Sequence, residues 1–374
     1  MTTGSIVMTC QTEGGEILGI PARIPDDGRV YLHNQRMGKV VVTRPNLLDA
    51  DFVYWVCLGK DFNEELVASS SGTKIKHTAP TRIQQFRLSL PPLNEQRAIA
   101  RVLGALDDKI ELNRRMNRTL EELAGALFRA WFVDFEPVVA KAAGRAPFGL
   151  APAVAALFPA TFTDSKLGPI PLGWRARPAP ELIEFNPTRR LAKNAPAPYL
   201  DMQNVPTNSA LPQEWIVRPF GSGMKFQNGD TLLARITPCL ENGKTAYVNA
   251  LMDGEVGWGS TEFIVMHPRD PLPPEFGYFL ARSDEFRAHA IANMTGSSGR
   301  QRVPVNCFET FLLAEPPAAL AREFGNFAAV AMRKMKVNVE ESRTLAALRD
   351  TLLPKLLSGE LRVKAAEKRV GAQA

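Results

Sequence analysis

The sequence is poor in the residues that build metal and redox centres. Its cysteines lie far apart, at Cys10, Cys57, Cys239 and Cys307, so no C-x-x-C pair exists, and the chain has only four histidines. A structural zinc site needs four such ligands at close spacing, and we therefore expect none. The thiols are expected to be reduced core residues, as is usual inside a cell.

Sequence motifs for common catalytic chemistry are also missing. There is no G-x-x-x-x-G-K-[ST] phosphate loop, no G-x-G-x-x-G fingerprint, no H-E-x-x-H and no G-x-S-x-G. The Asp-Pro-Pro-Tyr type of motif expected of an adenine methyltransferase is missing as well. Acidic residues at Asp26-Asp27 and in residues 241–244 are scattered, whereas two-metal nuclease chemistry needs carboxylates that converge. The sequence thus favours binding over catalysis.

Signals for export or membrane insertion are not visible either. Met1 is followed by Thr-Thr-Gly-Ser, which has neither the basic start nor the apolar core of a signal peptide. The most apolar tract, residues 150–162, is short and is interrupted by Pro152 and Pro159, whereas a membrane-spanning helix needs about 20 apolar residues. We therefore expect a cytoplasmic protein with no membrane partner.

Size and charge describe an ordinary globular chain with a basic balance. A length of 374 residues is long for one core and comfortable for two domains, and 22% charged with 45% hydrophobic residues is typical of folded proteins. The formal net charge is +6 and the pI is about 9.2, which favours a polyanionic partner. A basic protein without such a partner fits the charge equally well.

One stretch organises the chain, residues 91–135, with the sequence PPLNEQRAIARVLGALDDKIELNRRMNRTLEELAGALFRAWFVDF. Its apolar residues recur in steps of four and three or their sums, the period of a helix that packs along another helix. They are Ile99, Leu103, Leu106, Ile110, Leu120, Leu127 and Trp131. Asn113 and Asn117 are polar members of this seam, and a buried Asn there penalises sliding, because its amide finds a partner in one register only. A helix over residues 94–131 would be roughly 57 Å long at about 1.5 Å per residue, which suits a spacer.

The second half of the chain repeats this stretch. Aligning Pro91-Pro92 with Pro316-Pro317 gives a shift of 316 − 91 = 225, at which Asn113 meets Asn338 without a gap. The apolar partners at this shift are Ile99 with Phe324, Leu106 with Ala331, Ile110 with Met335, Leu120 with Leu345, and Leu127 with Leu352. An internal repeat is a strong fold signal, so we predict two copies of one unit, each ending in a long helix. We expect the two helices to pair antiparallel within the chain.

The segment before each long helix indicates an α+β fold. Residues 4–9, 30–32 and 38–42 are typical of short strands, with a turn at 14–15, residues 51–66 have helical spacing, and residues 72–77 are expected to form a loop. No β-α-β alternation is visible, so the predicted fold class is α+β: two globules of short strands and helices joined by two long antiparallel coiled-coil helices. Phe52 and Phe62 meet Phe276 and Phe286 at a shift of 224, which extends the repeat to the globules.

These observations divide the chain along its length. We predict a partial first globule in residues 1–90, a central spacer helix in 91–135, a connector in 136–166, a second globule in 167–315, and a C-terminal spacer helix and tail in 316–374. Residues 167–225 have no counterpart in the first copy, because subtracting 225 places their equivalents before Met1. Without this segment we expect the first globule to be the less stable half. Its absence implies either that the true start codon lies upstream or that the gene is truncated.

Cationic side chains recur through the second globule, with Asn and Gln residues that can read base edges between them. The candidates for DNA contact are Arg189, Arg190, Lys193, Arg218, Lys225, Arg235 and Lys244. Arg and Lys residues in loops are also the commonest residues of any solvated surface, so each of them has that plainer interpretation as well.

The loop of residues 296–302, GSSGRQR, is the sharpest candidate for a DNA contact. Its small residues let the backbone approach a phosphate, and Arg300, Gln301 and Arg302 offer bidentate partners for guanine and adenine. Its counterpart in the first copy, residues 71–76, is also basic and contains Lys74 and Lys76. The alternative is that both loops are plain turns.

The central stretch resembles the central region of the specificity subunits of type I restriction-modification enzymes. LRDTLLPKLLSGELRV, at residues 348–363, is similar to the C-terminal region of that family. GPIPLGW at residues 168–174 and NGDTLLARITP at 228–238 resemble the opening and the middle of the family's target recognition domains. The resemblance covers nearly the whole chain.

This resemblance implies a subunit that reads a split site on double-stranded DNA through two target recognition domains held apart by the helices. It implies partners as well: methyltransferase (M) subunits that use S-adenosylmethionine, and a restriction or motor (R) subunit that uses ATP and Mg²⁺. The chain itself would then carry no cofactor and no catalytic residue. One departure is that the second helix opens PPAALAREF and lacks the Glu95-Gln96 pair, so docking contacts carried by that pair would be asymmetric.

Two alternatives to this interpretation stay open from the sequence. The chain could be a DNA-modifying enzyme, either a methyltransferase or a nuclease, whose catalytic residues match no known motif. It could also be an assembly protein whose recognition domains no longer read DNA.

Overall fold

The computed structural model of the chain describes residues 6–9, 11–13, 18–24, 27–32, 34, 36–72, 75–297 and 299–366. It divides into two compact units: unit 1 comprises Met1–Leu112 and Ser342–Ala374, and unit 2 comprises Asn113–Glu341. Two long helices cross the boundary, so each unit contains one part of each helix.

The predicted spacer helix is α4 (Leu93–Phe132), and its repeat in the second copy is α10 (Ala318–Leu357). The prediction of residues 94–131 for α4 therefore missed one residue at each end. The predicted seam is confirmed where its side chains are at most 6% exposed: Ile99, Leu103, Leu106, Ile110 and Trp131 on α4, and Phe324, Ala331, Met335, Leu345 and Leu352 on α10. Near the end of α4 the seam drifts from Leu127 to Ala124 and Phe128, because a straight helix does not keep a strict seven-residue period.

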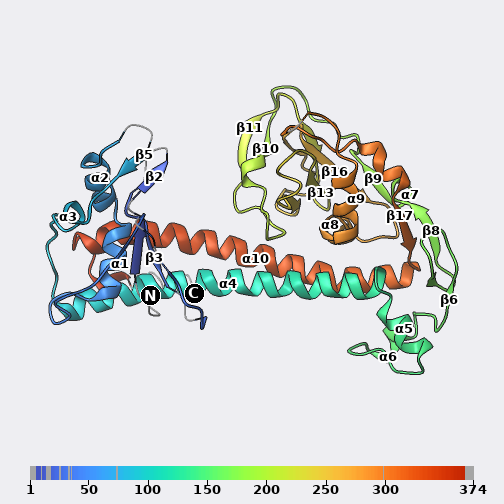
Figure 1. Ribbon diagram of the computed structural model, residues 1–374, viewed down its shortest axis with the longest axis horizontal. Helices are drawn as coiled ribbons and strands as arrows, with labels where there is room; N and C mark the ends of the chain where they lie inside the picture. The colour runs from blue at the N-terminus through green and yellow to red at the C-terminus, as the bar shows by residue number, and fades with distance from the viewer. Residues whose placement is uncertain are drawn as a thin grey trace. The chain divides into compact units, whose positions relative to one another are not determined.

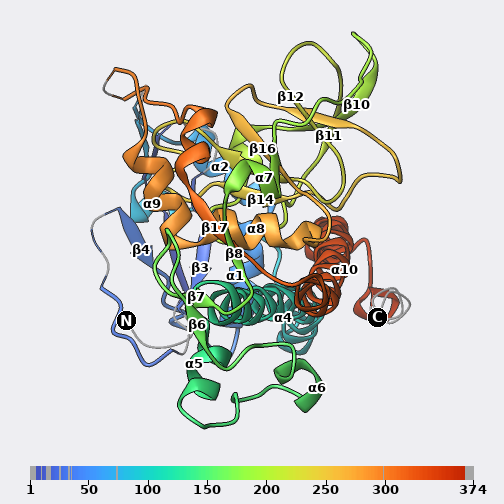
Figure 2. The same cartoon turned by 90° about the vertical axis from the view of Figure 1, so that its right-hand side faces the viewer.

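Helices α4 and α10 pair antiparallel in each unit, and both views show them side by side (Figures 1 and 2). In unit 1, Nη1 of Arg349 donates to the carboxylate of Asp107 at 2.5 Å. In unit 2, Asn113 contacts Asn338, whereas Asn117, further along α4, donates to the Met335 carbonyl, further back along α10, at 3.2 Å. The predicted antiparallel pairing within one chain is confirmed.

The polar positions of the seam form one cluster in unit 2. The side chains of Asn113 and Asn338 are 1% and 0% exposed. Nδ2 of Asn113 donates to the Asn338 carbonyl at 3.4 Å and to the Glu341 carboxylate at 2.8 Å, and Nδ2 of Asn338 donates to Oδ1 of Asn117 at 2.7 Å. Asn113 and Asn338 are equivalents at the repeat shift of 225, so the two copies meet here at the same residue. These bonds fix one register of the helix pair.

Unit 1 combines short strands with helices that lead into α4. Its strands are β1 (Ile6–Thr9), β2 (Gln11–Glu13), β3 (Pro21–Arg23), β4 (Met37–Lys39) and β5 (Ile75–His77), and its helices before α4 are α1 (Ala50–Leu58), α2 (Lys60–Ala68) and α3 (Pro80–Ile83). Strand β1 is the centre of a three-stranded antiparallel sheet, in the order β3-β1-β4, and β2 pairs antiparallel with β5.

Helix α1 attaches this sheet to the helix pair. It begins where the Asp49 carboxylate accepts a hydrogen bond from the Phe52 amide at 3.1 Å, as Asp does at helix starts. Phe52 and Trp55 are fully buried and belong to the same cluster as Ile99 and Leu103 of α4. Burial of this face supplies the core of unit 1.

Gln96 has a structural role rather than the docking role that the sequence suggested. Its buried side chain accepts a hydrogen bond from the Asp49 amide at 2.9 Å and donates to the carbonyls of Leu47 and Pro91 at 2.9 and 2.8 Å. These bonds satisfy the amide completely within the chain, since each amide hydrogen has its own acceptor. Gln96 therefore holds the start of α4 to the segment before α1, and it is not available to a partner.

Unit 2 contains the remaining elements. Its helices are α5 (Glu136–Ala142), α6 (Pro152–Ala155), α7 (Ala179–Leu182), α8 (Pro274–Arg282) and α9 (Asp284–Ala292), with short 3-10 helices η1 (Met202–Asn204) and η2 (Val305–Thr310). Its strands are β6 (Phe162–Thr163), β7 (Ile170–Pro171), β8 (Arg175–Pro178), β9 (Ile183–Phe185), β10 (Pro196–Leu200), β11 (Ile216–Pro219), β12 (Met224–Phe226), β13 (Thr231–Ala234), β14 (Thr245–Tyr247), β15 (Gly257–Gly259), β16 (Phe263–Pro268) and β17 (Leu312–Glu315). Two four-stranded sheets result, in the orders β14-β13-β16-β9 and β11-β10-β15-β12.

The repeat predicted from the sequence is visible in these elements. Helices α1 and α8 begin at Ala50 and Pro274, a shift of 274 − 50 = 224, and α2 and α9 keep the same shift. Strands β1 and β13 begin at Ile6 and Thr231, a shift of 231 − 6 = 225. The strand order β14-β13-β16 of unit 2 matches the order β3-β1-β4 of unit 1. The two globules therefore share one central motif.

Three local predictions for the first globule were wrong. Residues 30–32 form no strand, whereas their equivalent in unit 2 is close to β15, which pairs with β10 and β12. Residues 75–77, expected in a loop, are strand β5. The single helix expected over residues 51–66 is two helices, because Gly59 adopts an extended conformation between them. The predicted turn at residues 14–15 lies outside the described residues.

Aromatic rings join the helix pair of unit 2 to its globule. Phe324 of α10 lies against Phe128 and Phe132 of α4 with ring centroids 5.8 and 5.3 Å apart, and Phe132 lies against Phe276 of α8 at 5.3 Å. These rings are buried, and several meet edge to face, the arrangement that aromatic pairs prefer. All of them belong to one buried hydrophobic cluster.

Glu121 of α4 adds polar contacts to the same junction. Its carboxylate accepts hydrogen bonds from the hydroxyl of Tyr278 at 2.5 Å and from the amide of Ala210 at 2.9 Å. Burial raises the pKa of Tyr278 well above its ordinary value, so the phenol stays a donor to this carboxylate. The globule of unit 2 is thus fixed to α4 by both packing and charge-assisted hydrogen bonds.

The observed mixture of helices and small sheets is α+β, as predicted. The strand pairs are antiparallel apart from β10 with β15, which pair parallel among the described strands. Across the part of the chain that the structure describes, no helix has both the length and the apolar character needed to cross a lipid bilayer.

Candidate nucleic-acid interface

Arg189 is held inside unit 2 rather than displayed on a DNA-facing surface. Its Nε and Nη2 donate to the Asp230 carboxylate at 3.0 and 2.6 Å, and Nη1 contacts Gln227. The side chains of Arg189 and Asp230 are 13% and 0% exposed. Asp230 also accepts from the Gln227 amide at 2.7 Å and lies 2.8 Å from Nδ1 of His267. The guanidinium is therefore committed to a structural ion pair.

The next two candidates, Arg190 and Lys193, are exposed on the loop that leads into β10. The loop is fixed at its ends: Asn186 and Asn194 adopt left-handed conformations with φ of 54° and 63°, and the Asn194 amide donates to the Phe220 carbonyl at 2.9 Å. Asn tolerates this conformation better than most residues. Among the described residues neither cation forms an ion pair, so both remain available to an anionic ligand.

Arg218 and Lys225 stand over aromatic rings beside this loop. The guanidinium of Arg218 lies 4.8 Å from the ring centre of Tyr199, and Nζ of Lys225 lies 4.9 Å from that of Phe220. Nζ of Lys225 also donates to the Arg189 carbonyl at 3.2 Å. Cation–π contacts hold a charge in place without neutralising it, so these side chains are orientated and still cationic.

A third ring unites this surface. Trp258 of β15 lies 4.4 Å from Tyr199 and 5.4 Å from Phe220, measured between ring centroids. We call the surface formed by Arg190, Lys193, Arg218 and Lys225 the cationic sheet surface. It is built on the strands β10, β11, β12 and β15, which form one sheet. Figure 1 shows β10 and β11 of this sheet.

Lys244 and Arg235 differ from this group. Nζ of Lys244 donates to the carbonyls of Met202 and Gln203 at 2.6 and 3.3 Å, which is a structural role in closing η1 onto the sheet. Arg235 is half-buried, and its Nε is buried without a hydrogen-bond partner in the described residues. The structure thus separates Lys244, which acts within the fold, from Arg235, whose side chain is not fully satisfied.

The loop of residues 296–302, described except for residue 298, is anchored at its last residue. Thr295 and Arg302 exchange backbone hydrogen bonds of 3.0 and 2.8 Å, and the Thr237 amide donates to the Gln301 carbonyl at 3.0 Å. Arg302 donates through Nε and Nη2 to the Glu262 carboxylate at 2.9 and 2.7 Å. Arg300 is exposed, with no ion pair in the described residues.

The basic loop of the first copy cannot be compared in the same way. Lys74 lies outside the described residues, and Lys76 is on strand β5 with its side chain outside them. Of the cationic candidates, those with described side chains all belong to unit 2.

The sequence did not reveal the residues that decide which of these cations are internal, paired or exposed. Asp230 and Glu262 decide that Arg189 is internal and that Arg302 is paired, and Tyr199, Phe220 and Trp258 support the cationic sheet surface. Both ion pairs join segments that are distant in sequence, so no local spacing could reveal them. In the described residues there is no group of three or more His, Cys, Asp or Glu side chains placed to hold a metal ion.

Fold and surface together define a class of protein, a scaffold in which an α+β unit is repeated along an antiparallel helix pair. Unit 2 carries the cationic sheet surface, in which Arg218 and Lys225 lie over aromatic rings. Comparison with known proteins leads further. Residues 6–122 match the family model described as the type I restriction modification DNA specificity domain.

Relatives and a solved structure agree with that match. The type I restriction enzyme HindI specificity subunit of Haemophilus influenzae is 33% identical over 138 residues, covering 34% of this chain and 30% of that protein. The MjaIX specificity subunit of Methanocaldococcus jannaschii is 22% identical over 324 residues, covering 84% and 70%. The crystal structure of a type I restriction-modification S subunit from M. genitalium has the same fold, with a TM-score of 0.52 at 16% identity over 95% of this chain and 83% of that one. This chain is therefore similar in sequence and in fold to type I restriction-modification specificity subunits.

Proposed function

We propose that the chain is the sequence-reading subunit of a type I restriction-modification complex, and that it binds double-stranded DNA without supplying catalytic chemistry. The observation that carries this proposal is the cationic sheet surface, in which Arg218 and Lys225 are orientated by aromatic rings while Arg190 and Lys193 stay exposed. Similarity to specificity subunits supports it: the alignments span 30% of the HindI subunit and 70% of the MjaIX subunit.

Within this proposal the candidate residues have different roles. Exposed cations such as Arg190 and Lys193 suit contacts with phosphates, which fix the position of a protein on the duplex. Side chains with several directed hydrogen bonds, such as Gln301 and Arg302, suit contacts with base edges, which carry sequence information. One unit would read one part of a split site.

Removing phosphate contacts gives the first test. In the complex with its methyltransferase subunits, replacing Arg190 and Lys193 together by Ala is expected to weaken binding of all duplexes alike. The slope of log K against log salt concentration should fall by about 2, one for each lost cation–phosphate contact. Filter binding or fluorescence anisotropy over a salt series measures both quantities.

The matched control removes two exposed cations of the same unit, Lys166 between β6 and β7 and Arg175 on β8. Figure 1 shows β6 and β8 apart from β10 and β11. Equal slopes for the parent and for the variant lacking Arg190 and Lys193 would place the DNA elsewhere. The rival function has its own readout: cleavage or methylation of DNA by the chain alone, given Mg²⁺, S-adenosylmethionine and ATP, would make it an enzyme.

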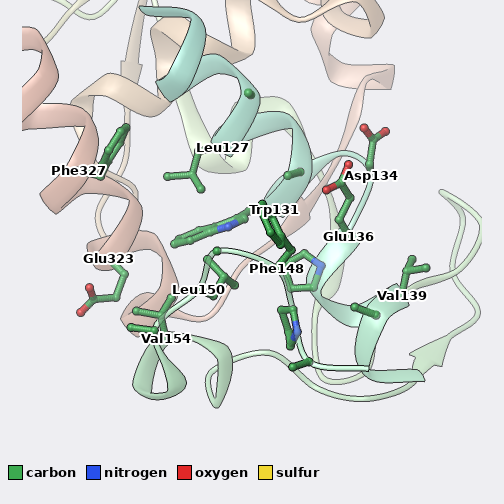
Figure 3. Close-up of a pocket in the computed structure, with 18 of the residues that line it drawn as sticks. Leu127, Trp131, Asp134, Glu136, Val139, Phe148, Leu150, Val154, Glu323 and Phe327 are labelled. Carbon is green, nitrogen blue, oxygen red and sulfur yellow. The ribbon is translucent and has the colours of Figure 1, made fainter. Parts of the chain in front are cut away.

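We further propose that methyltransferase subunits dock on an apolar groove of unit 2 (Figure 3). The groove has a volume of about 1140 Å³ and lies where the end of α4 and the start of α10 face the segment around α5 and α6. Leu123 and Phe327 are exposed in it, and Phe148 is fully exposed at its edge. Contiguous exposed apolar side chains of this size mark interaction sites more often than solvent-facing surface. A restriction subunit that uses ATP belongs to the same proposed assembly.

A charge placed in this groove should prevent docking. Replacing Leu123 and Phe327 together by Asp is expected to weaken association with the methyltransferase subunits by roughly 10- to 100-fold, because burying an unpaired carboxylate opposes the contact. Replacing Met252, an exposed apolar residue outside the groove, by Asp is the control and should leave association unchanged. Isothermal titration with purified methyltransferase measures the affinities, and equal values for both variants would remove the groove from the interface.

A further inference from the structure

The backbone of Arg302 is fixed more firmly than that of any other residue described in its loop. Its amide and carbonyl are both bonded to Thr295, and it forms a second isolated bridge with Ile236. The next residue, Val303, is fully buried and its amide donates to the Arg235 carbonyl at 2.9 Å. Arg302 is therefore tied both to the start of its own loop and to the distant segment at residues 235–236, and its Cα has little freedom to move.

Glu262 fixes the side chain as well. It lies in the turn between β15 and β16, where its amide donates to Oγ of Ser260 at 3.1 Å and its carbonyl accepts from the Arg235 amide at 2.9 Å. Its carboxylate accepts from Nε of Arg302 at 2.9 Å and from Nη2 at 2.7 Å. Both partners of this ion pair are thus held by backbone contacts to the same Arg235 segment.

The ion pair occupies one edge of the guanidinium and leaves a second edge that does not face Glu262. Glu262 takes the edge formed by Nε and Nη2, so the edge formed by Nη1 and Nη2 still points its hydrogens away from the carboxylate. The Nη1 group has a weak contact of 3.5 Å with the Arg300 carbonyl. Two parallel N–H donors on this outer edge match O6 and N7 of guanine, the commonest bidentate contact of arginine with a base.

We propose that Arg302, orientated by Glu262, reads a guanine in the major groove, and that Glu262 is a positioning residue for this specificity. The proposal rests on the proposed function, because it names a base that the DNA-reading subunit selects. The ion pair also has no net charge, so it adds little to the attraction for phosphates, and the paired arginine contributes to choosing a sequence more than to general affinity.

Arg300 provides an internal contrast. It lies in the same loop, is exposed, and has no ion pair among the described residues. Its amide donates to the Ser297 carbonyl at 3.0 Å, which is the only backbone bond of that amide in the described part of the loop. An exposed cation without an ion pair attracts phosphates of any sequence, so Arg300 should support affinity while Arg302 supports discrimination.

The test compares selected sequences rather than activity. The complex of the full chain with its methyltransferase subunits selects duplexes from a randomised pool, and sequencing of the bound fraction gives its motif. We expect the parent to select a guanine that Glu262→Gln and Arg302→Lys no longer select, with a loss of discrimination of roughly 5- to 150-fold at that position. Lys keeps the charge but lacks the planar fork, so total binding should persist. Glu262→Gln frees the Arg302 charge and should raise the salt slope by about 1.

Glu241→Gln is the matched control, since Glu241 is an exposed carboxylate nearby that accepts from Thr237 instead of Arg302. It should keep the parent motif. If the parent complex shows no sequence preference at all, the proposed function fails and this inference with it. If the parent selects a motif that both Glu262→Gln and Arg302→Lys retain unchanged, the function stands and the inference is wrong. A uniform gain of affinity with an unchanged motif would show that Glu262 merely competes with DNA for Arg302.

Discussion

Replacing Phe324 by Ala is expected to lower the free energy of unfolding by about 3 to 5 kcal/mol. The ring is 0% exposed and lies within 6.5 Å, between ring centroids, of the rings of Phe128, Trp131, Phe132 and Phe279. Alanine would remove those contacts and leave a cavity between α4, α10 and the globule that rigid aromatic neighbours cannot fill. For a unit of this size the melting temperature should fall by roughly 6 to 20 °C.

The control for Phe324 is Phe327→Ala on the same helix, because Phe327 is 41% exposed and gives up less buried surface than Phe324. Thermal and urea unfolding of the chain, followed by circular dichroism, compare the two variants. A loss of less than about 1 kcal/mol for Phe324→Ala, or equal losses for both variants, would mean that the aromatic cluster does not hold the globule of unit 2 to the helix pair.

Replacing Arg189 by Ala should have a comparable effect on stability for a different reason. The carboxylate of Asp230 would remain buried without its main cation, and breaking a buried ion pair from one side typically lowers stability by about 3 to 5 kcal/mol. His267 and the Gln227 amide would still contact Asp230, which places the expected loss near the lower end of that range. The loop that carries Arg190 and Lys193 would also lose the support of its first residues.

Arg190→Ala, one position along the chain, separates folding from binding. Arg190 is exposed, so its removal should change stability by no more than about 0.5 kcal/mol while reducing the affinity for DNA. Urea unfolding and DNA binding are measured on both variants. A stable Arg189→Ala variant that has lost DNA binding would show that Arg189 contacts DNA directly, as its sequence position suggested.

The two long helices and the internal repeat could be predicted, because both follow from periodic patterns in the sequence. The seam of α4 and its copy in α10 follow from apolar spacing, and the repeat shift that aligns Phe52 with Phe276 also aligns the helices that contain them. These residues are apolar because they are buried, so their spacing in the sequence is enough to predict the helices. The strand predicted at residues 30–32 is not formed, and apolar spacing could not show this, since a short strand exists only where a neighbouring strand pairs with it.

The candidate site was predictable only as a set of cations. Arg189, Arg190 and Arg302 are alike in sequence, yet one is buried against Asp230, one is exposed, and one is paired with Glu262. What distinguishes them is the position of a carboxylate in space: Asp230 lies 41 residues from Arg189 in the sequence, and Glu262 lies 40 residues from Arg302. Charge and composition cannot assign these partners, because Coulomb interactions depend on distance in space.

The buried asparagines of the helix pair bear on how the chain reaches this structure. Asn338 bonds to Asn117 across 221 residues, so the helices can align only after most of the intervening chain has been made and brought together. Contacts of such large sequence separation slow folding and allow misaligned intermediates to form first. In a pairing shifted by one turn, an amide would be buried against apolar side chains and would lose its partner, which makes that intermediate short-lived. We therefore expect misaligned helices to separate again during folding, whereas the aligned pair keeps its asparagine bonds and is retained.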